Sequence, residues 1–265
     1  MRAKLFFGLV FYLFVGKALA QELRQKNLSF ETGIDFIFSE PTKMDFVRGD
    51  VPSYYNLGEA TSNLSSLQFK NYLGIKAEVF TLNNKFALTG GIRYTHLYGA
   101  IGKQSYWYVT TSDFFYVLVT QNNSNTELMK VKEVTQSSHY VGVPLELKFF
   151  PMSPHLIQIY FKAGLEFNFR VKTKTDVVFS NDDMSIYKNK IADLVRNPGN
   201  FCAVANGAAG LRIGRPYKIN FSLEGNLPVV FITQETTGVV NPLSGVGFQC
   251  NLYIPLKKVN QNLKN

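Results

Sequence analysis

Long runs of alternating apolar and polar residues mark this chain, and the clearest pair lies in the stretch 137–171. Successive side chains of a strand point to opposite faces, so each run has one uniformly apolar face and one charged face. The second run follows a turn at 151–154 and is about 15 residues long, whereas an average strand has about five or six. The pattern therefore predicts a long hairpin that is apolar on one side and charged on the other.

The same alternation recurs along the chain and delimits eight strands. They span residues 28–38, 67–82, 85–99, 137–149, 157–171, 201–214, 219–232 and 244–256. The connections run long, short, long, short, long, short and medium, and bacterial outer-membrane barrels have short periplasmic turns, long outer loops and an even strand count. The sequence therefore predicts an all-β fold, an eight-stranded antiparallel up-and-down transmembrane β-barrel with long extracellular loops and both termini in the periplasm.

Two connections are long enough to hold structure of their own. The insertion 100–136 contains the aromatic runs Tyr106-Trp107-Tyr108 and Phe114-Phe115-Tyr116, which predict a hairpin around 111–113. Its arms of about 7 residues are shorter than the 9 to 11 of a membrane strand, so we expect it above the membrane, with a ten-stranded barrel as the fallback. The aromatic runs fit an interfacial girdle or loop packing better than a protein-binding surface. The other connection, 172–200, is expected to be a polar loop.

Alternation alone does not exclude a soluble barrel, which would place its apolar residues inside. Here the polar phase combines charges with many glycines and suits a narrow interior, while the other phase is bulky and suits lipid. Charges away from water must be paired, and opposite charges on neighbouring strands can pair. We therefore expect a salt-bridged plug, with a narrow passage for small solutes as the alternative. The predicted interior network consists of Lys76, Glu78, Arg93, Glu146, Lys148, Lys162, Glu166, Arg170, Arg212 and Glu224.

The N-terminus has the pattern of a secretory signal peptide. Arg2 and Lys4 precede an apolar core at 5–15, and small residues at 18–20 predict cleavage before Gln21. The apolar core is too short to span a bilayer. We expect residues 1–20 to be a signal peptide and 21–265 to form a single barrel domain.

Charge and composition narrow the range of partners. The formal charge of the chain is +9, and removal of Arg2, Lys4 and Lys17 would give 9 − 3 = +6. This excess suits anionic lipid surfaces, so outer-membrane lipid and lipopolysaccharide are expected partners. Other envelope or secreted proteins could bind the loops, and nucleic acid is not an expected partner because no RNA-binding motif is present. A mean hydropathy of −0.03 is compatible with transmembrane strands, since every second residue faces the interior.

The sequence contains few candidate catalytic residues. The sequence contains no His-Glu-x-x-His motif, nucleophile elbow or glycine-rich phosphate loop. Ser137 and His139 share a phase near His96, and a lipid hydrolase could use such a pair on a lipid-facing wall. Triad chemistry needs a carboxylate to orient the histidine, and none lies in phase. We therefore expect no enzyme activity, with a hydrolase using Ser137 and His139 as an alternative.

Two further sets of residues are candidate sites. Asp182 and Asp183 could help to hold Ca²⁺, but two carboxylates in a polar segment are more simply solvated, so we expect no metal and no cofactor. Cys202 and Cys250 fall in opposite phases, on strands separated by a third. We expect both to be free thiols.

A family resemblance rests on the strand Tyr140–Phe150. Its pattern Tyr-x-x-x-Pro-Leu-x-x-Lys-Phe precedes the pair Ala163-Gly164 on the next strand. In this the chain resembles the PorT-like outer-membrane β-barrel family of Bacteroidetes, which implies a barrel of this plan, and some members of that family assist protein secretion. The expected function is a non-enzymatic outer-membrane barrel with a structural, adhesive or secretion-accessory role through its extracellular loops.

Overall fold

The structure is a computed structural model of the 265-residue chain. It describes residues 26–48, 64–81, 85–102, 114–121, 125–152, 156–215, 218–233 and 236–256. The predicted signal peptide 1–20 and the run 106–108 lie outside the described residues. The described elements are β1 (Lys26–Pro41), β2 (Val47–Arg48), β3 (Ser65–Thr81), β4 (Phe86–Gly102), β5 (Phe115–Gln121), β6 (Asn125–Phe149), β7 (Ile157–Phe179), η1 (Asp182–Tyr187), α2 (Lys188–Leu194), β8 (Phe201–Ile213), β9 (Asn220–Phe231) and β10 (Val240–Pro255).

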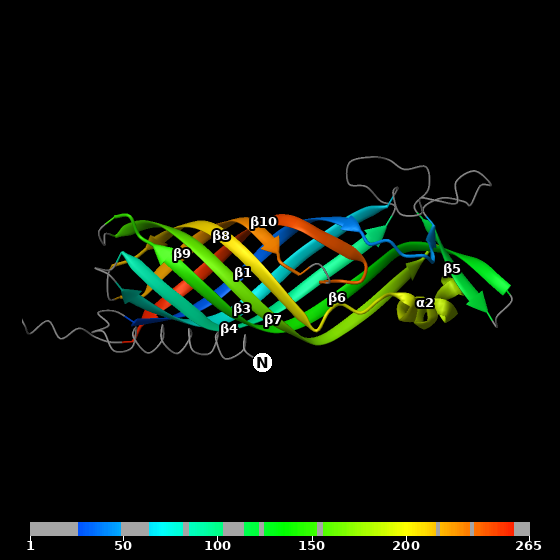
Figure 1. The fold of residues 1–265 in the computed structure, drawn as a ribbon, viewed down its shortest axis with the longest axis horizontal. Helices are drawn as coiled ribbons and strands as arrows, with labels where there is room; N and C mark the ends of the chain where they lie inside the picture. Colours follow the sequence, from blue (N-terminus) through cyan, green and yellow to red (C-terminus); the bar gives the residue numbers. More distant parts are fainter. Residues whose placement is uncertain are drawn as a thin grey trace, which may run out of the picture.

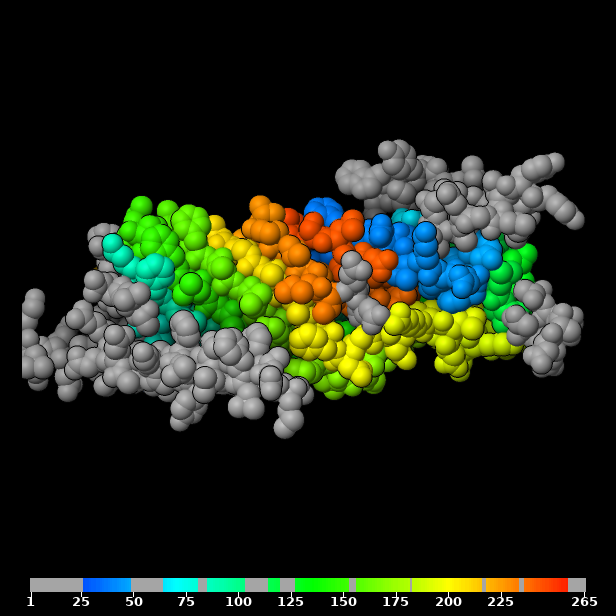
Figure 2. Space-filling view, viewed as in Figure 1, coloured from blue at the N-terminus to red at the C-terminus, as the bar shows by residue number. Residues whose placement is uncertain are grey.

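Eight of these strands form a closed antiparallel ring (Figure 1). The strand order is β2-β5-β6-β4-β3-β1-β10-β9-β8-β7, and a further pairing of β6 with β7 closes the ring. Residues from the two ends of the chain lie side by side in Figure 2, where β1 pairs with β10. The predicted eight-stranded up-and-down barrel is confirmed. Since β2 and β5 stand outside the ring, the ten strands of the described chain do not make a ten-stranded barrel.

The wall of the ring is apolar outside and polar inside, the reverse of a soluble barrel. This arrangement follows from the alternation of side chains along each strand. Its outward positions are apolar, and Leu73, Ile92 and Phe248 are 62%, 66% and 66% exposed. The inward positions between them carry charges, and Arg93 and Lys148 are buried. Side chains of one phase must share one face of a strand, so the polar phase of each ring strand points into the ring.

Two strands extend well beyond the ring. β6 begins at Asn125 and β7 ends at Phe179, although the sequence predicted strands only over 137–149 and 157–171. The expectation of a polar loop over 172–200 was therefore wrong, since this stretch holds the end of β7, η1 and α2. The predicted hairpin is also displaced, because residues 115–121 pair with 125–131 and not around 111–113. Apolar side chains of these strands pack in a second core. The alternation in the ring strands does not predict this core.

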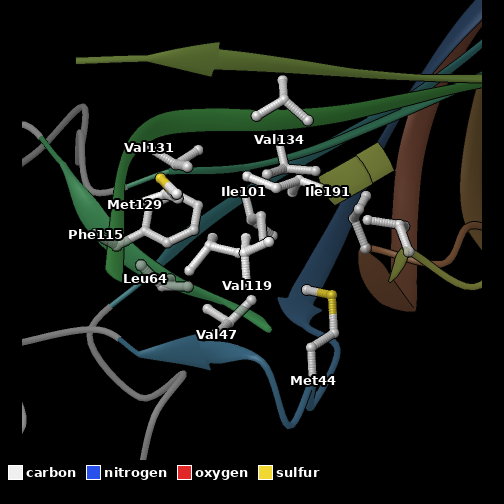
Figure 3. Packing of buried hydrophobic residues seen from close by; sticks show 14 of the residues in the cluster. Met44, Val47, Leu64, Ile101, Phe115, Val119, Met129, Val131, Val134 and Ile191 are labelled. Atoms are coloured by element: carbon white, nitrogen blue, oxygen red, sulfur yellow. The ribbon is translucent and has the colours of Figure 1, made fainter. Parts of the chain in front are cut away.

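That second core lies beyond one end of the ring, in a region we call the distal extension: β2, β5, residues 125–136 of β6, residues 172–179 of β7, η1 and α2. In Figure 3, side chains from β5, β6 and α2 point toward one another. The short turns lie at the opposite end of the molecule (Figure 1). The buried residues of this distal core are Met44, Val47, Leu64, Ile101, Phe115, Val117, Val119, Met129, Val131, Val134, Val177, Ile191, Val195, Val239 and Val240.

The two cysteines do not form a disulfide. Cys202 is buried on β8, Cys250 is half-buried on β10, and both are free. Strand β9 lies between them in the sheet. The prediction of two free thiols is confirmed.

Candidate functional site

A network of buried ion pairs fills the middle of the ring. It brings together six carboxylates and six cations of the described chain, each with a side-chain exposure of 3% or less. Equal numbers of acids and bases leave the network formally neutral, which a low-dielectric interior requires. The carboxylates are Glu31, Asp35, Glu78, Glu146, Glu166 and Glu224, and the cations are Lys70, Lys76, Arg93, Lys148, Lys162 and Arg212.

Arg93 on β4 is the centre of this network. Its guanidinium donates to both carboxylate oxygens of Glu31, at 2.8 and 2.7 Å, and to Glu166 at 2.5 Å. Bidentate pairs of this kind fix the relative geometry of two side chains as well as their energy. Lys76 joins the centre through Glu31 and Glu146, each at 2.7 Å. Arg93 also lies 3.4 Å from Glu146, so it connects β4 to β1, β6 and β7 inside the ring.

A second set of charges lies nearer the short turns. Arg212 donates to both oxygens of Glu78, at 2.7 and 2.8 Å, and its guanidinium stacks 3.8 Å from the ring centroid of Tyr253. Lys148 donates to the hydroxyl of Tyr253 at 2.7 Å, and Lys162 pairs with Glu224. Each of these charges thus has a direct polar partner.

Glycines make room for these bulky inward side chains. A Cβ on Gly74 would lie 2.4 Å from a carboxylate oxygen of Glu31, and a Cβ on Gly210 would lie 2.5 Å from the ring of Tyr160. Any larger residue at either position would displace the charge or ring that it faces. The glycines of the polar phase are therefore part of the packing of the interior.

A layer of mainly apolar side chains lies on each side of the ion-pair network. An aromatic layer near the short turns contains Phe80, Phe150 and Tyr160, whose neighbouring rings are 5.3 and 5.2 Å apart. On the other side lies a layer around Leu97 and Tyr140, and beyond it the distal core. The inward residues of β4 cross all four layers in order: Ala87, Arg93, Leu97 and Ile101.

Nine of the ten residues predicted for the interior network take part in it. The exception is Arg170, whose guanidinium donates to Asn200 at 2.6 Å in an exposed position. Arg170 keeps the inward phase, since it pairs with the buried Tyr140, but it lies where β7 leaves β8, and its backbone N–H donates to the carbonyl of Asn200 just before β8 begins.

Three members of the network were missing from the prediction. Glu31 and Asp35 lie in the polar phase of β1, and Lys70 lies in the same phase of β3 as Lys76. Lys70 lies six residues before Lys76, so the alternation of side chains along β3 also predicts that Lys70 faces inward. The signal was therefore present in the sequence.

On the outer face, the neighbours of the His139 ring are a tyrosine and a second histidine. The hydroxyl of Tyr94 lies 2.5 Å from Nδ1 of His139, and the ring of His96 stacks on His139 with centroids 4.8 Å apart. Ser137 lies across from Tyr98 and Lys174. In the described structure neither neighbour of the His139 ring supplies the carboxylate that a triad requires.

Other candidate sites are limited as well. Asp183 is exposed on η1, and the side chain of Asp182 lies outside the described part. Over the described ranges there is no group of three or more His, Cys, Asp or Glu side chains that could hold a metal ion. Nor does that part of the chain include a helix long and apolar enough to cross a membrane.

Comparison with known proteins adds little to this geometry. No protein-family model matches the chain, and no curated protein matches it. Among solved structures, the chain is similar to the transport unit of the autotransporter AIDA-I from Escherichia coli, with 6% identity, a TM-score of 0.25 and coverage of 89% of this chain and 91% of that one. It is also similar to a Pseudomonas aeruginosa FadL homologue, with 8% identity, a TM-score of 0.21 and coverage of 87% and 90%. Likenesses at these TM-scores carry no weight for fold or function.

Proposed function

We propose that this protein is a plugged β-barrel of the bacterial outer membrane with a non-catalytic role. The observation that carries the proposal is the inverted wall, in which large apolar side chains face outward while ion pairs are buried inside. An exposed apolar surface that encircles a barrel needs an apolar solvent, and a closed ring satisfies its backbone hydrogen bonds within a bilayer. The short turns and both strand ends near the termini then face the periplasm, as the loop order suggests.

The layered interior supports a structural or accessory role for the barrel. Aromatic, charged and apolar layers cross the ring in succession, so the inward side chains fill the space that a channel would need. The proposal therefore does not include a solute pore. It also does not include a lipid hydrolase, because His139 contacts a tyrosine and a second histidine.

The distal extension is the part that would act outside the cell. Its own apolar core makes it a packed platform on top of the wall. A rigid platform suits a structural, adhesive or secretion-accessory component, and the resemblance to PorT-like barrels favours the secretion-accessory version. Ile186 on η1 is 78% exposed and lies on this platform.

Two measurements test the proposal in turn. Purified protein should need detergent or lipid to stay in solution, and the unheated barrel should run faster than the boiled one on a denaturing gel. A protein that is stable in the aqueous fraction without detergent would overturn the membrane assignment. A photo-crosslinking residue at Ile186 should then capture a protein partner in intact cells, whereas the same residue at Lys218, beside a short turn, should not. If Ile186 captures none, the accessory role is wrong.

A further inference from the structure

Three rows of outward side chains cross β3, β4, β6 and β7 where the wall leaves the apolar band. Each row follows the cross-strand partners of the sheet. The first row is Leu73, Tyr94, Val141 and Phe169; the second is Asn71, His96, His139 and Lys172; the third is Phe69, Tyr98, Ser137 and Lys174. The first row is apolar or aromatic and exposed, and the second is entirely polar. The outer surface thus changes from apolar side chains in the first row to hydrogen-bonding side chains in the second.

The register shift between His139 and Tyr140 creates this sharp change on β7. At the shift, Val171 and Lys172 are both exposed, and Val171 reaches 68%. A bulge re-aims the residues that follow it, so the lysines after Val171 continue on the outer face. Thr173, in between, contacts the inward Ser138 at 3.1 Å. We call Asn71, His96, His139, Lys172 and Lys174 the boundary patch.

The imidazole of His139 is held in one orientation. The Tyr94 hydroxyl lies 2.5 Å from Nδ1, and in the tautomer in which this hydroxyl donates to Nδ1 the ring carries its proton on Nε2 and can donate it to a ligand. The stacked ring of His96 supports the same orientation from the neighbouring strand. The contacts with Tyr94 and His96 therefore fix the orientation in which the His139 imidazole meets a ligand.

The two lysines of the patch, Lys172 and Lys174, form no direct ion pair within the described part of the chain. The carboxylates further along this face are engaged elsewhere: Asp176 pairs with Lys188 at 2.5 Å, and Glu133 accepts from Tyr98 at 3.4 Å. The boundary patch is thus a set of donors and positive charges, and its neighbouring acid Asp176 has its ion pair with Lys188, whose hydrogen bond, helped by the charge of Lys174, lowers the pKa of that carboxyl.

We propose that the boundary patch binds the phosphate headgroup of an anionic lipid whose acyl chains lie along Leu73, Tyr94, Val141 and Phe169. This inference rests on the proposed function, because only a barrel in a bilayer presents the patch to lipid. Lysine and imidazole donors match phosphate oxygens, and the adjoining apolar row matches the chains. Free phosphate shares the head chemistry but leaves the apolar row unused, so the lipid is the assigned ligand.

Native mass spectrometry of the detergent-folded protein tests the assignment with defined probes. Dioctanoyl phosphatidic acid should bind saturably, and dioctanoyl phosphatidylcholine should not. Each lysine near a charged lipid surface contributes roughly a fivefold change in affinity, so Lys172→Gln with Lys174→Gln should weaken binding on the order of twentyfold. His139→Gln should weaken it by about tenfold or more, because one hydrogen bond to a charged group is lost.

The matched control removes two exposed lysines of the distal region that lie outside the patch, Lys43→Gln with Lys190→Gln, and should bind as the parent does. Heat-modifiable migration on a gel verifies that every variant is folded. Equal binding by the parent and the Lys172/Lys174 variant would overturn the site while leaving the barrel intact. Inorganic phosphate binding as tightly as the lipid would overturn the lipid assignment. A protein that never folds in detergent would instead refute the proposed function, and the site with it.

Discussion

The ring and the distal extension bury opposite kinds of side chain, although the same strands run through both. Along β4, the inward position Arg93 belongs to the ion-pair network, and further on Ile101 belongs to the distal core. The outward positions change in the opposite sense, from the apolar Ile92 to the polar His96. The two faces of one strand therefore exchange their chemistry at the level of the boundary patch.

This exchange follows from the solvent around each part. In lipid, apolar side chains lose nothing by facing outward, so the interior can hold charges provided that they are paired. In water, the hydrophobic effect requires the apolar side chains to be inside. Under the proposed location, the boundary between the two solvents lies close to Tyr94 on β4, where the apolar outer series ends. The two regions should also respond differently to mutation.

Removal of the central charge should have the largest effect. Arg93→Leu leaves the carboxylates of Glu31 and Glu166 without a main partner, and breaking a buried pair from one side costs about 3–5 kcal/mol. The free energy of unfolding in urea, measured by gel mobility in lipid vesicles, should fall by that amount. Arg170→Leu is the matched control, since Arg170 lies outside the network, and it should change the free energy by less than about 1 kcal/mol. Equal losses would mean that the network does not stabilise the ring.

Truncation in the distal core should act locally. Phe115 is fully buried on β5, so Phe115→Ala should destabilise the distal extension by about 3 kcal/mol through lost burial and a cavity. Limited proteolysis should then cut the extension faster while the urea midpoint of the ring stays unchanged. Leu128→Ala, at an exposed position on the neighbouring strand, should leave proteolysis unaffected. A parallel fall of the ring midpoint would show that the two regions unfold as one unit.

Charges of the ring should be coupled to each other, unlike apolar residues. Glu78→Gln and Arg212→Gln each leave a buried charge, but the double variant removes both members of the bidentate pair. The double variant should therefore lose about 2 kcal/mol less than the sum of the two single losses. A double-mutant cycle on the free energy of unfolding measures this coupling. Strict additivity would show that Tyr253 and Lys148 take over the pairing.

The ring was predictable from the sequence because its signal repeats on every strand. The charges at 76, 146, 148 and 162 fall in the polar phase, and parity alone places them inside. Arg170 also falls in the polar phase and pairs with the inward Tyr140, but it lies beyond the last pairing of β7 with β8, at Phe169 and Phe201, and its guanidinium donates to Asn200 in an exposed position. Parity predicts which face a side chain takes, but not where along the strand the paired interior ends.

The distal extension was largely missed for a different reason. Its inward residues Val131 and Val134 are three positions apart, because a register shift lies between Val131 and Glu133, and the period of two is therefore interrupted in this stretch. The apolar residues of the distal extension also face inward, which is the arrangement that water favours. The rule that assigned apolar residues to the outer face could not be applied beyond the ring. The pairing of β2 with β5 involves only Val47 and Arg48 of β2, which is too short for any periodic signal.

The smallest effect is expected from pH at the surface of the distal extension, outside the ring. The hydrogen bond that Lys188 donates to Asp176, 2.5 Å long, lowers the pKa of that carboxyl, and the charge of Lys188 acts in the same direction. A lowered folded pKa means that the stabilisation is complete above the ordinary aspartate pKa of about 4 and is lost as the pH falls through the folded value. Since the two side chains are 39% and 46% exposed, solvent screening limits the contribution to a few tenths of a kcal/mol. Hydrogen exchange of α2 should therefore accelerate slightly between pH 5 and about pH 3, after correction for the intrinsic exchange rate. Asp176→Asn should exchange at the faster corrected rate at both pH values, and a parent protein with no such difference would show that the pair does not hold α2 against β7.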